Sequence, residues 1–434
     1  MKFVSTRGGA PPASLGTALV NGLAPDGGLY VPETIEPWTP GEIAALPSRS
    51  LVEIGVRTLA PFTREDLDDA ALAALVADAL DFPIPLVEVE PGVYALELFH
   101  GPTLAFKDVG ARVLARLLAA LRAGQPLTVL VATSGDTGGA VAHAFHDVPG
   151  IRVVVLYPEG RVSPTQEAQL TMFNAPDGKA NVTAYAVAGS FDDCQRLVKA
   201  AFADDSLGRA AGLTSANSIN IGRLLPQMIY YFHAVARLGA GATPLVATPS
   251  GNFGNLAAGL IAKRSGLPVA RFVAATNVND VVPEYLRTGR FTPRASVQTL
   301  ANAMDVGNPS NFDRMRWLYK DDVNAMRRDV AGSRHDDEEV RATIRRVYEE
   351  RGYVLDPHSA IAYLGLVGRV GRVGRVGIFL ATAHPAKFRE IVEPIVGRSV
   401  DVPAPLAAAL ARPRRVVRLR ATLDALRARL TTND

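Results

Sequence analysis

Residues 127–146, LTVLVATSGDTGGAVAHAFH, contain the pattern that indicates the fold class. An apolar run at 127–132 is followed by a polar, glycine-rich turn, and a helical pattern begins at Ala140. A short apolar run bounded by turn residues is typical of a buried strand. We therefore interpret this stretch as a strand, a turn and a helix.

The same order of patterns occurs twice more, in PLVATPSGNFGNLAAGLIAKR at 244–264 and in GIFLATAHP at 377–385. Two further strand candidates lie at 151–157 and 269–275. Strands that alternate with helices predict an α/β fold with mainly parallel sheets. Such sheets bind ligands at the carboxyl ends of their strands, which is where the three polar turns fall.

Composition excludes several classes of protein. The 434 residues are 48% hydrophobic and 21% charged, which is ordinary for a globular chain of two or three domains, and no apolar stretch has the length of a membrane span. The single cysteine, Cys194, excludes an intramolecular disulfide and a multi-cysteine metal site, and no metal is expected. The net charge of +3 is too small to indicate nucleic-acid binding. The first residues contain no apolar segment of signal-peptide length, so a cytoplasmic location is expected.

Lys107 has an unusual setting for a lysine. Only seven of the 46 basic residues are lysines, and this one follows the turn-prone and then apolar run GPTLAF at 101–106, where a helix is expected to begin. Apolar surroundings favour the uncharged amine, a nucleophile that arginine cannot provide. The alternative is that Lys107 is an exposed residue at a helix start that Asp108 caps.

The turn SGNFGN at 250–255 has the composition of an anion site. Glycines let backbone N–H groups approach a phosphate at a helix start, although a plain tight turn would look similar. Neither this turn nor SGDTG at 134–138 matches G-x-G-x-x-G, and G-x-x-x-x-G-K-[ST] does not occur. A lysine in apolar company, a separate anion site and no nucleotide motif point to pyridoxal 5'-phosphate, which needs a lysine, a phosphate site and a partner for its pyridine nitrogen.

Five motifs give the chain a resemblance to the threonine synthases, in their longer bacterial and fungal class. The motifs are FHGPTLAFKD, ATSGDTGGA, TSANSINIGRLLPQ, TPSGNFGN and LATAHPAKF, and they occur in the order and at the spacing of that family. The resemblance implies the α/β fold type II of pyridoxal-phosphate enzymes, also found in the tryptophan synthase β subunit. Two α/β domains with mainly parallel sheets and an N-terminal extension are then expected. The implied boundaries are an N-terminal segment at 1–95 packing on the large domain, a smaller domain at 96–235 with the lysine and the substrate loop, and a large domain at 236–434 with the cofactor-phosphate loop.

The resemblance also implies an activity. A threonine synthase is a pyridoxal-phosphate-dependent carbon-oxygen lyase that converts O-phospho-L-homoserine and water to L-threonine and phosphate by γ-elimination and β-addition of water. The implied partner is this small molecule, with neither nucleic acid nor membrane, in a monomer or a homodimer. Two alternatives stay open: a phospho-lyase that releases 2-oxobutyrate from phosphohomoserine, and a non-catalytic relative with the same fold.

Residue roles follow from the resemblance. Lys107 matches the lysine that forms the Schiff base and acts as a general base, and Thr382 matches the residue that faces the pyridine nitrogen. The remaining implied roles are the cofactor-phosphate loop (Gly251, Asn252, Phe253 and Asn255), the loop for the substrate carboxylate and the O3′ side of the cofactor (Ser134, Gly135, Asp136 and Thr137), and the substrate-phosphate site (Asn217, Ser218 and Arg223).

Three segments outside the motifs or at their edges also carry expectations. The Val-Gly-Arg repeat at 367–377 is expected to be a surface connection, because glycine disfavours helix. The leucines at 419, 423, 426 and 430 are at helical spacing and predict an amphipathic helix in the arginine-rich segment 412–429. An apolar helix is expected at 224–236, directly after Arg223.

Overall fold

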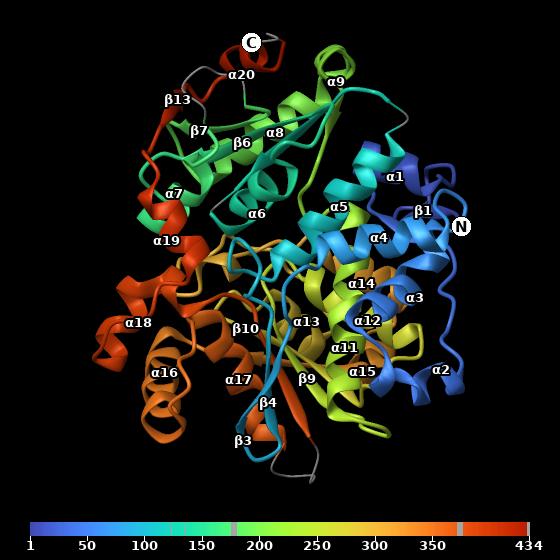
Figure 1. Cartoon of the computed structure of the whole chain (residues 1–434), viewed down its shortest axis with the longest axis vertical. Helices are drawn as coiled ribbons and strands as arrows, with labels where there is room; N and C mark the ends of the chain where they lie inside the picture. The colour runs from blue at the N-terminus through green and yellow to red at the C-terminus, as the bar shows by residue number, and fades with distance from the viewer. Residues whose placement is uncertain (123, 134, 175–179, 371–375, 432–434) are drawn as a thin grey trace.

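The computed structural model describes residues 1–122, 124–133, 135–174, 180–370 and 376–431. Two β-sheets, each covered by helices, lie one above the other (Figure 1). A short antiparallel pair of strands, β1 (Phe3–Ser5) and β2 (Tyr30–Pro32), forms a third sheet near the N-terminus. No helix in the described part of the chain is long and apolar enough to cross a membrane.

The larger sheet has the strand order β11-β10-β9-β12-β4-β3. All neighbouring pairs are parallel except the hairpin of β3 and β4. The strand order reverses between β9 and β12, and ligand sites of open α/β sheets lie at such reversals. The strands are β3 (Leu86–Glu90), β4 (Val93–Glu97), β9 (Leu245–Pro249), β10 (Arg271–Thr276), β11 (Val330–Arg334) and β12 (Gly377–Ala381).

The smaller sheet has the order β13-β7-β6-β5-β8, and every pair in it is parallel. Its order reverses between β5 and β8. The residues of β5 are all buried, as expected for a parallel strand covered on both faces. The strands are β5 (Leu127–Ala132), β6 (Ile151–Pro158), β7 (Val182–Val187), β8 (Leu213–Thr214) and β13 (Val417–Leu419).

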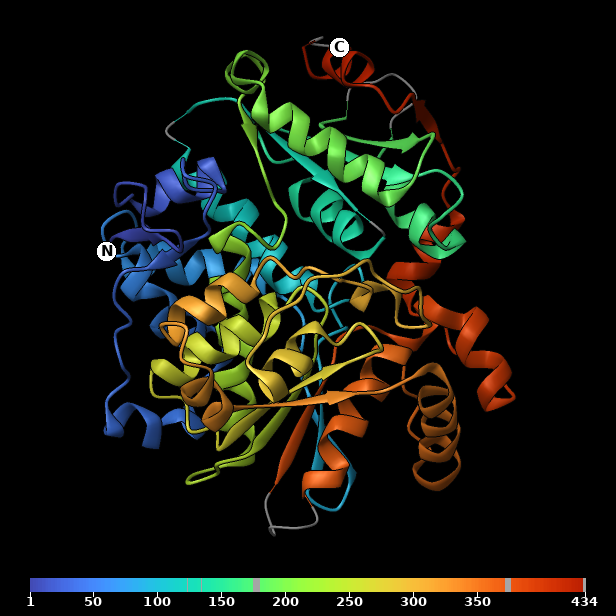
Figure 2. The ribbon, with the colours of Figure 1, turned by 180° about the vertical axis from the view of Figure 1, so that it is seen from behind.

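Helices cover both sheets. Among them, α17 packs along the larger sheet and α8 lies across the smaller one (Figure 2). Those nearest the larger sheet or the N-terminal segment are α1 (Leu15–Asn21), α2 (Pro40–Ala44), α3 (Leu51–Thr63), α4 (Asp69–Ala79), α11 (Met228–Leu238), α12 (Gly254–Arg264), α13 (Val281–Thr288), α14 (Phe312–Leu318), α15 (Val323–Asp329), α16 (Asp337–Arg351), α17 (Pro357–Val370) and α18 (Arg389–Val396), with the 3-10 turns η1 (Leu46–Ser48), η3 (Asn302–Met304) and η4 (Pro385–Phe388). Those nearest the smaller sheet are α6 (Asp136–Phe145), α7 (Pro164–Thr171), α8 (Phe191–Ala203), α9 (Asp205–Ala211), α19 (Ala404–Ala411) and α20 (Leu423–Thr431).

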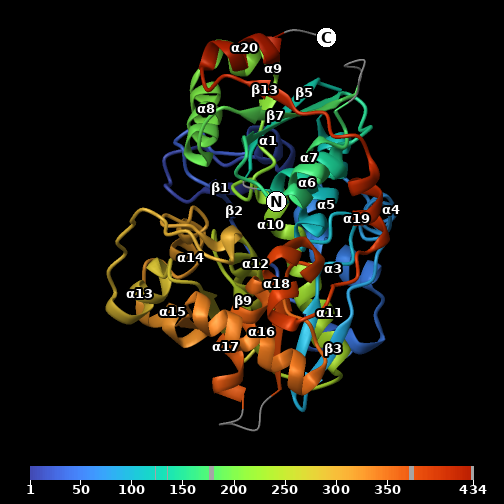
Figure 3. The ribbon, with the colours of Figure 1, turned by 90° about the vertical axis from the view of Figure 1, so that its left-hand side faces the viewer.

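One helix, α5 (Lys107–Leu121), lies between the two halves (Figure 3). It contacts α6 of the smaller half, and it also contacts α4, α1 and α10 (Ile221–Leu224). Ten of its residues are buried, so apolar packing fixes the position of its first residue, Lys107. The lysine that the sequence singles out therefore starts a rigid helix at the junction.

The α/β fold with mainly parallel sheets is confirmed, and the strands expected at 127–132 and 377–381 have those bounds. Two elements cross the boundaries that the resemblance implies, since β4 spans residue 95 and α11 spans residue 235. In addition, β13 joins the smaller sheet, although residues 236–434 were expected in the large domain. The repeat also differs from expectation: α17 continues through Val370, and residues 371–375 lie outside the described residues. In the C-terminal segment, strand β13 precedes α20 where one helix was expected.

Candidate active site

Polar turns from both sheets meet at the carboxyl ends of the strands beside the two reversals. The turns after β9 and β12 come from the larger sheet, and those after β5 and β8 from the smaller one. Asn252, after β9, donates through its Nδ2 to the Oγ of Ser218, after β8, at 2.6 Å. The Lys387 ammonium, after β12, lies 2.9 Å from Asp136 Oδ1, after β5, and β12 is the neighbour of β9. The three turns predicted to bind ligands thus belong to one junction between the sheets.

The turn before Lys107 is held by the residue after it. Asp108 is buried, and its carboxylate accepts from the backbone N–H of Thr103 at 2.9 Å and from the Thr103 hydroxyl at 2.6 Å. A Cβ on Gly101 would lie 2.5 Å from Asp108 Oδ2, so only glycine fits there. Asp108 therefore folds the turn against α5 rather than capping an exposed helix start. The Lys107 side chain itself is only 15% exposed.

Charges around Lys107 bear on its protonation. Burial lowers the pKa of Lys107; the Asp136 carboxylate, whose Oδ2 lies 3.8 Å from Nζ, opposes this, and the cations of Lys387 and Arg223 add to the lowering. Burial would raise the pKa of Asp136, but the ammonium groups of Lys387 and Lys107 outweigh it and hold that pKa well below its usual value. The site thus favours an ionised Asp136 beside a lysine that loses its proton readily.

The turn after β5 brings Asp136 to this position. Gly135 has φ +139°, a backbone conformation that residues with a side chain rarely adopt. A Cβ there would also lie 2.4 Å from Gln166 Cδ, so only glycine fits at this position. Helix α6 starts at Asp136 without a cap from Gly135, and the Gly138 N–H in its first turn donates to the Thr133 hydroxyl at 2.8 Å. The N–H groups of Asp136 and Thr137 remain for a ligand. Thr137 is partly exposed in this first turn, and Ser134 lies outside the described residues.

The turn after β9 has the tight backbone of an anion cradle. A Cβ on Gly251 would lie 2.7 Å from the carbonyl oxygen of Ala303, and Phe253 has a left-handed backbone with φ +61°, which is strained for a large side chain. The Asn252 amide oxygen accepts from the Ser310 N–H at 2.7 Å. Helix α12 then starts without a side-chain cap.

Asn255 supplies an unused donor in the first turn of α12. Its Oδ1 accepts from the hydroxyls of Tyr230 and Tyr231, both at 2.6 Å, which fixes the orientation of the amide. Its Nδ2 is buried and has no hydrogen-bond partner among the described residues. An orphaned buried N–H at an uncapped helix start fits an anion such as a cofactor phosphate.

Arg223 is buried, in contrast to an ordinary surface arginine. Pro226 breaks the helix expected at 224–236 into α10, η2 (Leu225–Gln227) and α11, so Arg223 lies within α10 rather than before a helix. Its Nη1 donates to the Ala216 carbonyl at 2.6 Å, and its Nε has no hydrogen-bond partner in the described part of the chain. Burial lowers the pKa of Arg223 to about 10. A desolvated cation with a free donor fits an anionic ligand.

The neighbouring turn carries the other two residues predicted for the substrate phosphate. Ser218 contacts Asn252 as described, and the backbone N–H of Asn217 donates to the Ser215 hydroxyl at 3.2 Å. The buried guanidinium of Arg314 donates to the carbonyls of Ser218 at 3.0 Å and of Ile219 at 2.6 Å. Arg314 was not singled out in the sequence, because it lies far along the chain in no motif.

Thr382 follows β12 and is tied to the Lys107 turn. Its carbonyl accepts from the Phe106 N–H at 2.9 Å, and Ala383 forms an isolated bridge with Ala105. Thr382 is largely buried. Thr382 and Lys107 thus belong to one backbone unit.

Sequence reasoning missed Lys387 and Gln166. The Lys387 ammonium lies 2.9 Å from Asp136 Oδ1, and the Gln166 Nε2 donates to the same oxygen at 3.2 Å. Lys387 belongs to the motif LATAHPAKF and is one of only seven lysines, so the scarcity that drew attention to Lys107 applied to it as well.

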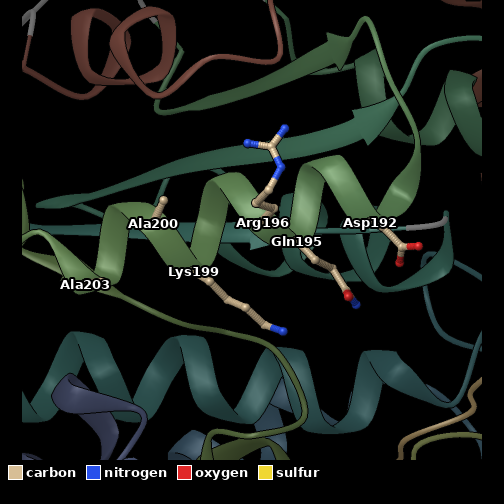
Figure 4. A pocket seen from close by; sticks show the side chains of 6 residues that line it. All are labelled: Asp192, Gln195, Arg196, Lys199, Ala200 and Ala203. Carbon is tan, nitrogen blue, oxygen red and sulfur yellow. The ribbon is translucent and has the colours of Figure 1, made fainter. Parts of the chain in front are cut away.

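A separate surface hollow lies on the outer helix of the smaller half (Figure 4). Gln195 and Lys199 extend from one side of α8 and Arg196 from the other. The residues that line the hollow are Asp192, Gln195, Arg196, Lys199, Ala200 and Ala203. None of them is among the predicted site residues.

Comparison with known proteins agrees with this geometry. Residues 80–382 match the family described as pyridoxal-phosphate dependent enzyme, and residues 2–80 and 366–429 match the N-terminal and C-terminal families of threonine synthase. The threonine synthase of Escherichia coli is 44% identical over 409 residues, covering 94% of both chains. The chain belongs to the threonine synthase family. The Haemophilus influenzae threonine synthase is 48% identical over 392 residues, covering 90% of both chains.

A solved structure extends this similarity to the fold. The threonine synthase of Brucella melitensis, described as bound to pyridoxal phosphate, has a TM-score of 0.93 and 37% identity, covering 99% of both chains. The chain described here is accordingly a pyridoxal-phosphate enzyme of α/β fold type II. The residues present fit the cofactor, because the orphaned Asn255 Nδ2 and the tight turn at Gly251 provide a phosphate cradle apart from Lys107.

Proposed function

We propose that this threonine synthase family member converts O-phospho-L-homoserine and water to L-threonine and phosphate, with Lys107 as the cofactor lysine. The observation that carries the proposal is the position of Lys107, at the start of α5 beside Asp136 and on the same backbone unit as Thr382. When bound, pyridoxal phosphate withdraws electrons from the carbons beside the substrate nitrogen, so that protons leave them readily. A cytoplasmic location and a monomeric or homodimeric state remain predictions.

The residues of the chain bind the cofactor and the substrate and transfer the protons. Lys107 removes the Cα proton, moves protons at Cβ and returns one at the end, for which its readily lost proton suits it. Gly251, Asn252, Phe253 and Asn255 hold the cofactor phosphate, and the Thr382 hydroxyl faces the pyridine nitrogen. Asp136 faces the O3′ side, and Ser134, Gly135 and Thr137 bind the substrate carboxylate.

The leaving phosphate has its own site in this proposal. Arg223, Asn217 and Ser218 bind the phosphate of the substrate, apart from the cradle for the cofactor phosphate. Charge-assisted bonds from a buried guanidinium strengthen as the departing oxygen gains negative charge, which favours elimination. Water then adds at Cβ, and the hydroxyl of threonine forms there.

Product identification tests the proposed reaction. Protein incubated with O-phosphohomoserine should release equal amounts of threonine and phosphate, measured by amino-acid analysis and a phosphate assay. Borohydride reduction followed by mass spectrometry should place the cofactor on the peptide that contains Lys107. Release of 2-oxobutyrate in place of threonine would favour the phospho-lyase, and an adduct on Lys263 or Lys387 would contradict the role of Lys107.

Replacing Thr382 with valine tests its hydroxyl. Thr382→Val keeps the shape of the side chain, so the cofactor should stay bound, while kcat should fall roughly tenfold, equivalent to a hydrogen bond of about 1–2 kcal/mol. Thr276→Val is a matched control, because this buried threonine ends the strand β10 and donates to the Ser333 carbonyl at 3.1 Å. Wild-type turnover in Thr382→Val would mean that another group faces the pyridine nitrogen.

A further inference from the structure

Lys387 is a charged side chain with no exposed surface. Its ammonium donates to the Thr103 carbonyl at 2.8 Å and lies 2.9 Å from Asp136 Oδ1. A buried cation is stable only with partners that replace water, and both partners of this one belong to the active site. Packing alone would not select a lysine at this position.

The Asp136 carboxylate lies closer to Lys387 than to Lys107. Its Oδ1 accepts from Lys387 at 2.9 Å and from the Gln166 amide at 3.2 Å, whereas Oδ2 lies 3.8 Å from Lys107 Nζ. The latter distance is beyond a strong hydrogen bond. The close contacts of the carboxylate therefore go to Lys387 and Gln166, and Lys107 receives only the weaker, longer-range attraction.

Both sides of this arrangement are held rigidly. The turn η4, which carries Lys387, is capped by His384, whose Nδ1 accepts from the Ala386 N–H at 3.1 Å. Burial lowers the pKa of His384 to about 4, so the ring stays neutral and keeps that lone pair. On the other side, the Gln169 amide also donates to the Thr103 carbonyl, at 3.3 Å.

We infer that Lys387 is a positioning residue, which binds Asp136 and thereby prevents this carboxylate from pairing fully with Lys107. The inference rests on the proposed role of Lys107 as the cofactor lysine. Among the described residues, the charged groups that act on Lys107 are Asp136 of α6, Lys387 of η4 and Arg223 of α10, and His358 of α17 acts on Asp136. Without the Lys387 cation, Lys107 is the nearest counter-ion for Asp136, and the protonated form of Lys107 gains stability.

The test removes the charge of Lys387 and keeps a donor. In holoprotein with Lys387→Gln, the pH midpoint of the absorption band of the bound cofactor, and the acidic limb of the kcat profile, should both rise by about one pH unit. Lys387→Arg should restore both values. Lys263→Gln is the matched control and should change neither, because Lys263 likewise donates to a carbonyl, of Val269 at 2.8 Å, and pairs with Asp329 at 3.0 Å.

A purely structural lysine would give a different result. Lys387→Gln would then unfold at a lower temperature with both midpoints unmoved, which would overturn the inference. If this variant yields no folded protein, Asp136→Asn replaces it: with the carboxylate gone, Lys107 faces two cations and the spectral midpoint should fall by about one pH unit. An unmoved midpoint there would equally overturn the inference, whereas a cofactor adduct away from Lys107 would contradict the proposed function instead.

Discussion

Lys107→Ala should lower kcat by roughly a thousandfold or more, because the variant loses both the amine that holds the cofactor and the group that moves protons. Lys387 cannot take its place, since its ammonium is buried and bound to Asp136 and to the Thr103 carbonyl. Turnover of O-phosphohomoserine measures the loss. The absorption band of the lysine-bound cofactor should disappear with it.

Two comparisons separate this loss from misfolding. Lys263→Ala also removes a partly buried lysine, and it should keep kcat within about threefold while losing some stability. In Lys107→Ala, a small primary amine in the buffer should restore part of the activity, whereas a tertiary amine should not. Activity near wild type without any added amine would refute the role of Lys107.

Arg223→Ala should lower kcat/KM by about a hundredfold or more, because the departing phosphate loses its charge-assisted bonds in the transition state. Arg223→Lys should fall between this variant and wild type, since it keeps the charge and loses the planar fork. The cofactor content of both variants should match wild type, because the proposed cradle of the cofactor phosphate lies on the turn after β9. Stability should decrease by about 1 kcal/mol, the usual contribution of one hydrogen bond such as that to the Ala216 carbonyl.

Arg112 provides the control for burial. It is also a buried arginine, and its guanidinium donates to the Ala79 carbonyl at 2.7 Å and to Asp81 at 2.8 Å. Arg112→Ala should lose stability and keep kcat/KM within about threefold. Inorganic phosphate should raise the unfolding temperature of wild type and of Arg112→Ala, but not of Arg223→Ala. Parallel loss of cofactor and activity in Arg223→Ala would show that Arg223 serves the cofactor or the fold.

Local sequence patterns predicted the elements that depend only on residues close to one another in the sequence. Strand β5 and the start of α5 at Lys107 follow from runs of apolar residues and from turn residues beside them. Strand β13 was missed because the strand with which it pairs, β7, lies more than 200 residues earlier, and no local pattern records that pairing. The prediction of one continuous helix at 224–236 was wrong, because Pro226 has no backbone N–H and its ring disfavours a continuous helix.

The prediction of the site residues was limited in the same way as the prediction of the fold. Glycine-rich turns and a scarce lysine marked the positions of Gly135, Gly251 and Lys107, because these depend on local backbone chemistry. The burial of Arg223 and the contact of Lys387 with Asp136 depend on how the two sheets meet, so the sequence alone did not distinguish them from surface cations.

The pairing of β4 with β12 has a consequence for synthesis of the chain. Val93 pairs with Gly377, so about 280 residues separate the two partners. At a translation rate of about 5–20 residues per second, roughly 15–60 s pass between the synthesis of β4 and that of β12. During this time the other edge of β4 pairs with β3. Throughout this interval an open strand edge can pair with other chains, and a chaperone would protect it. The cofactor can find its complete binding site only when translation of the chain is almost finished.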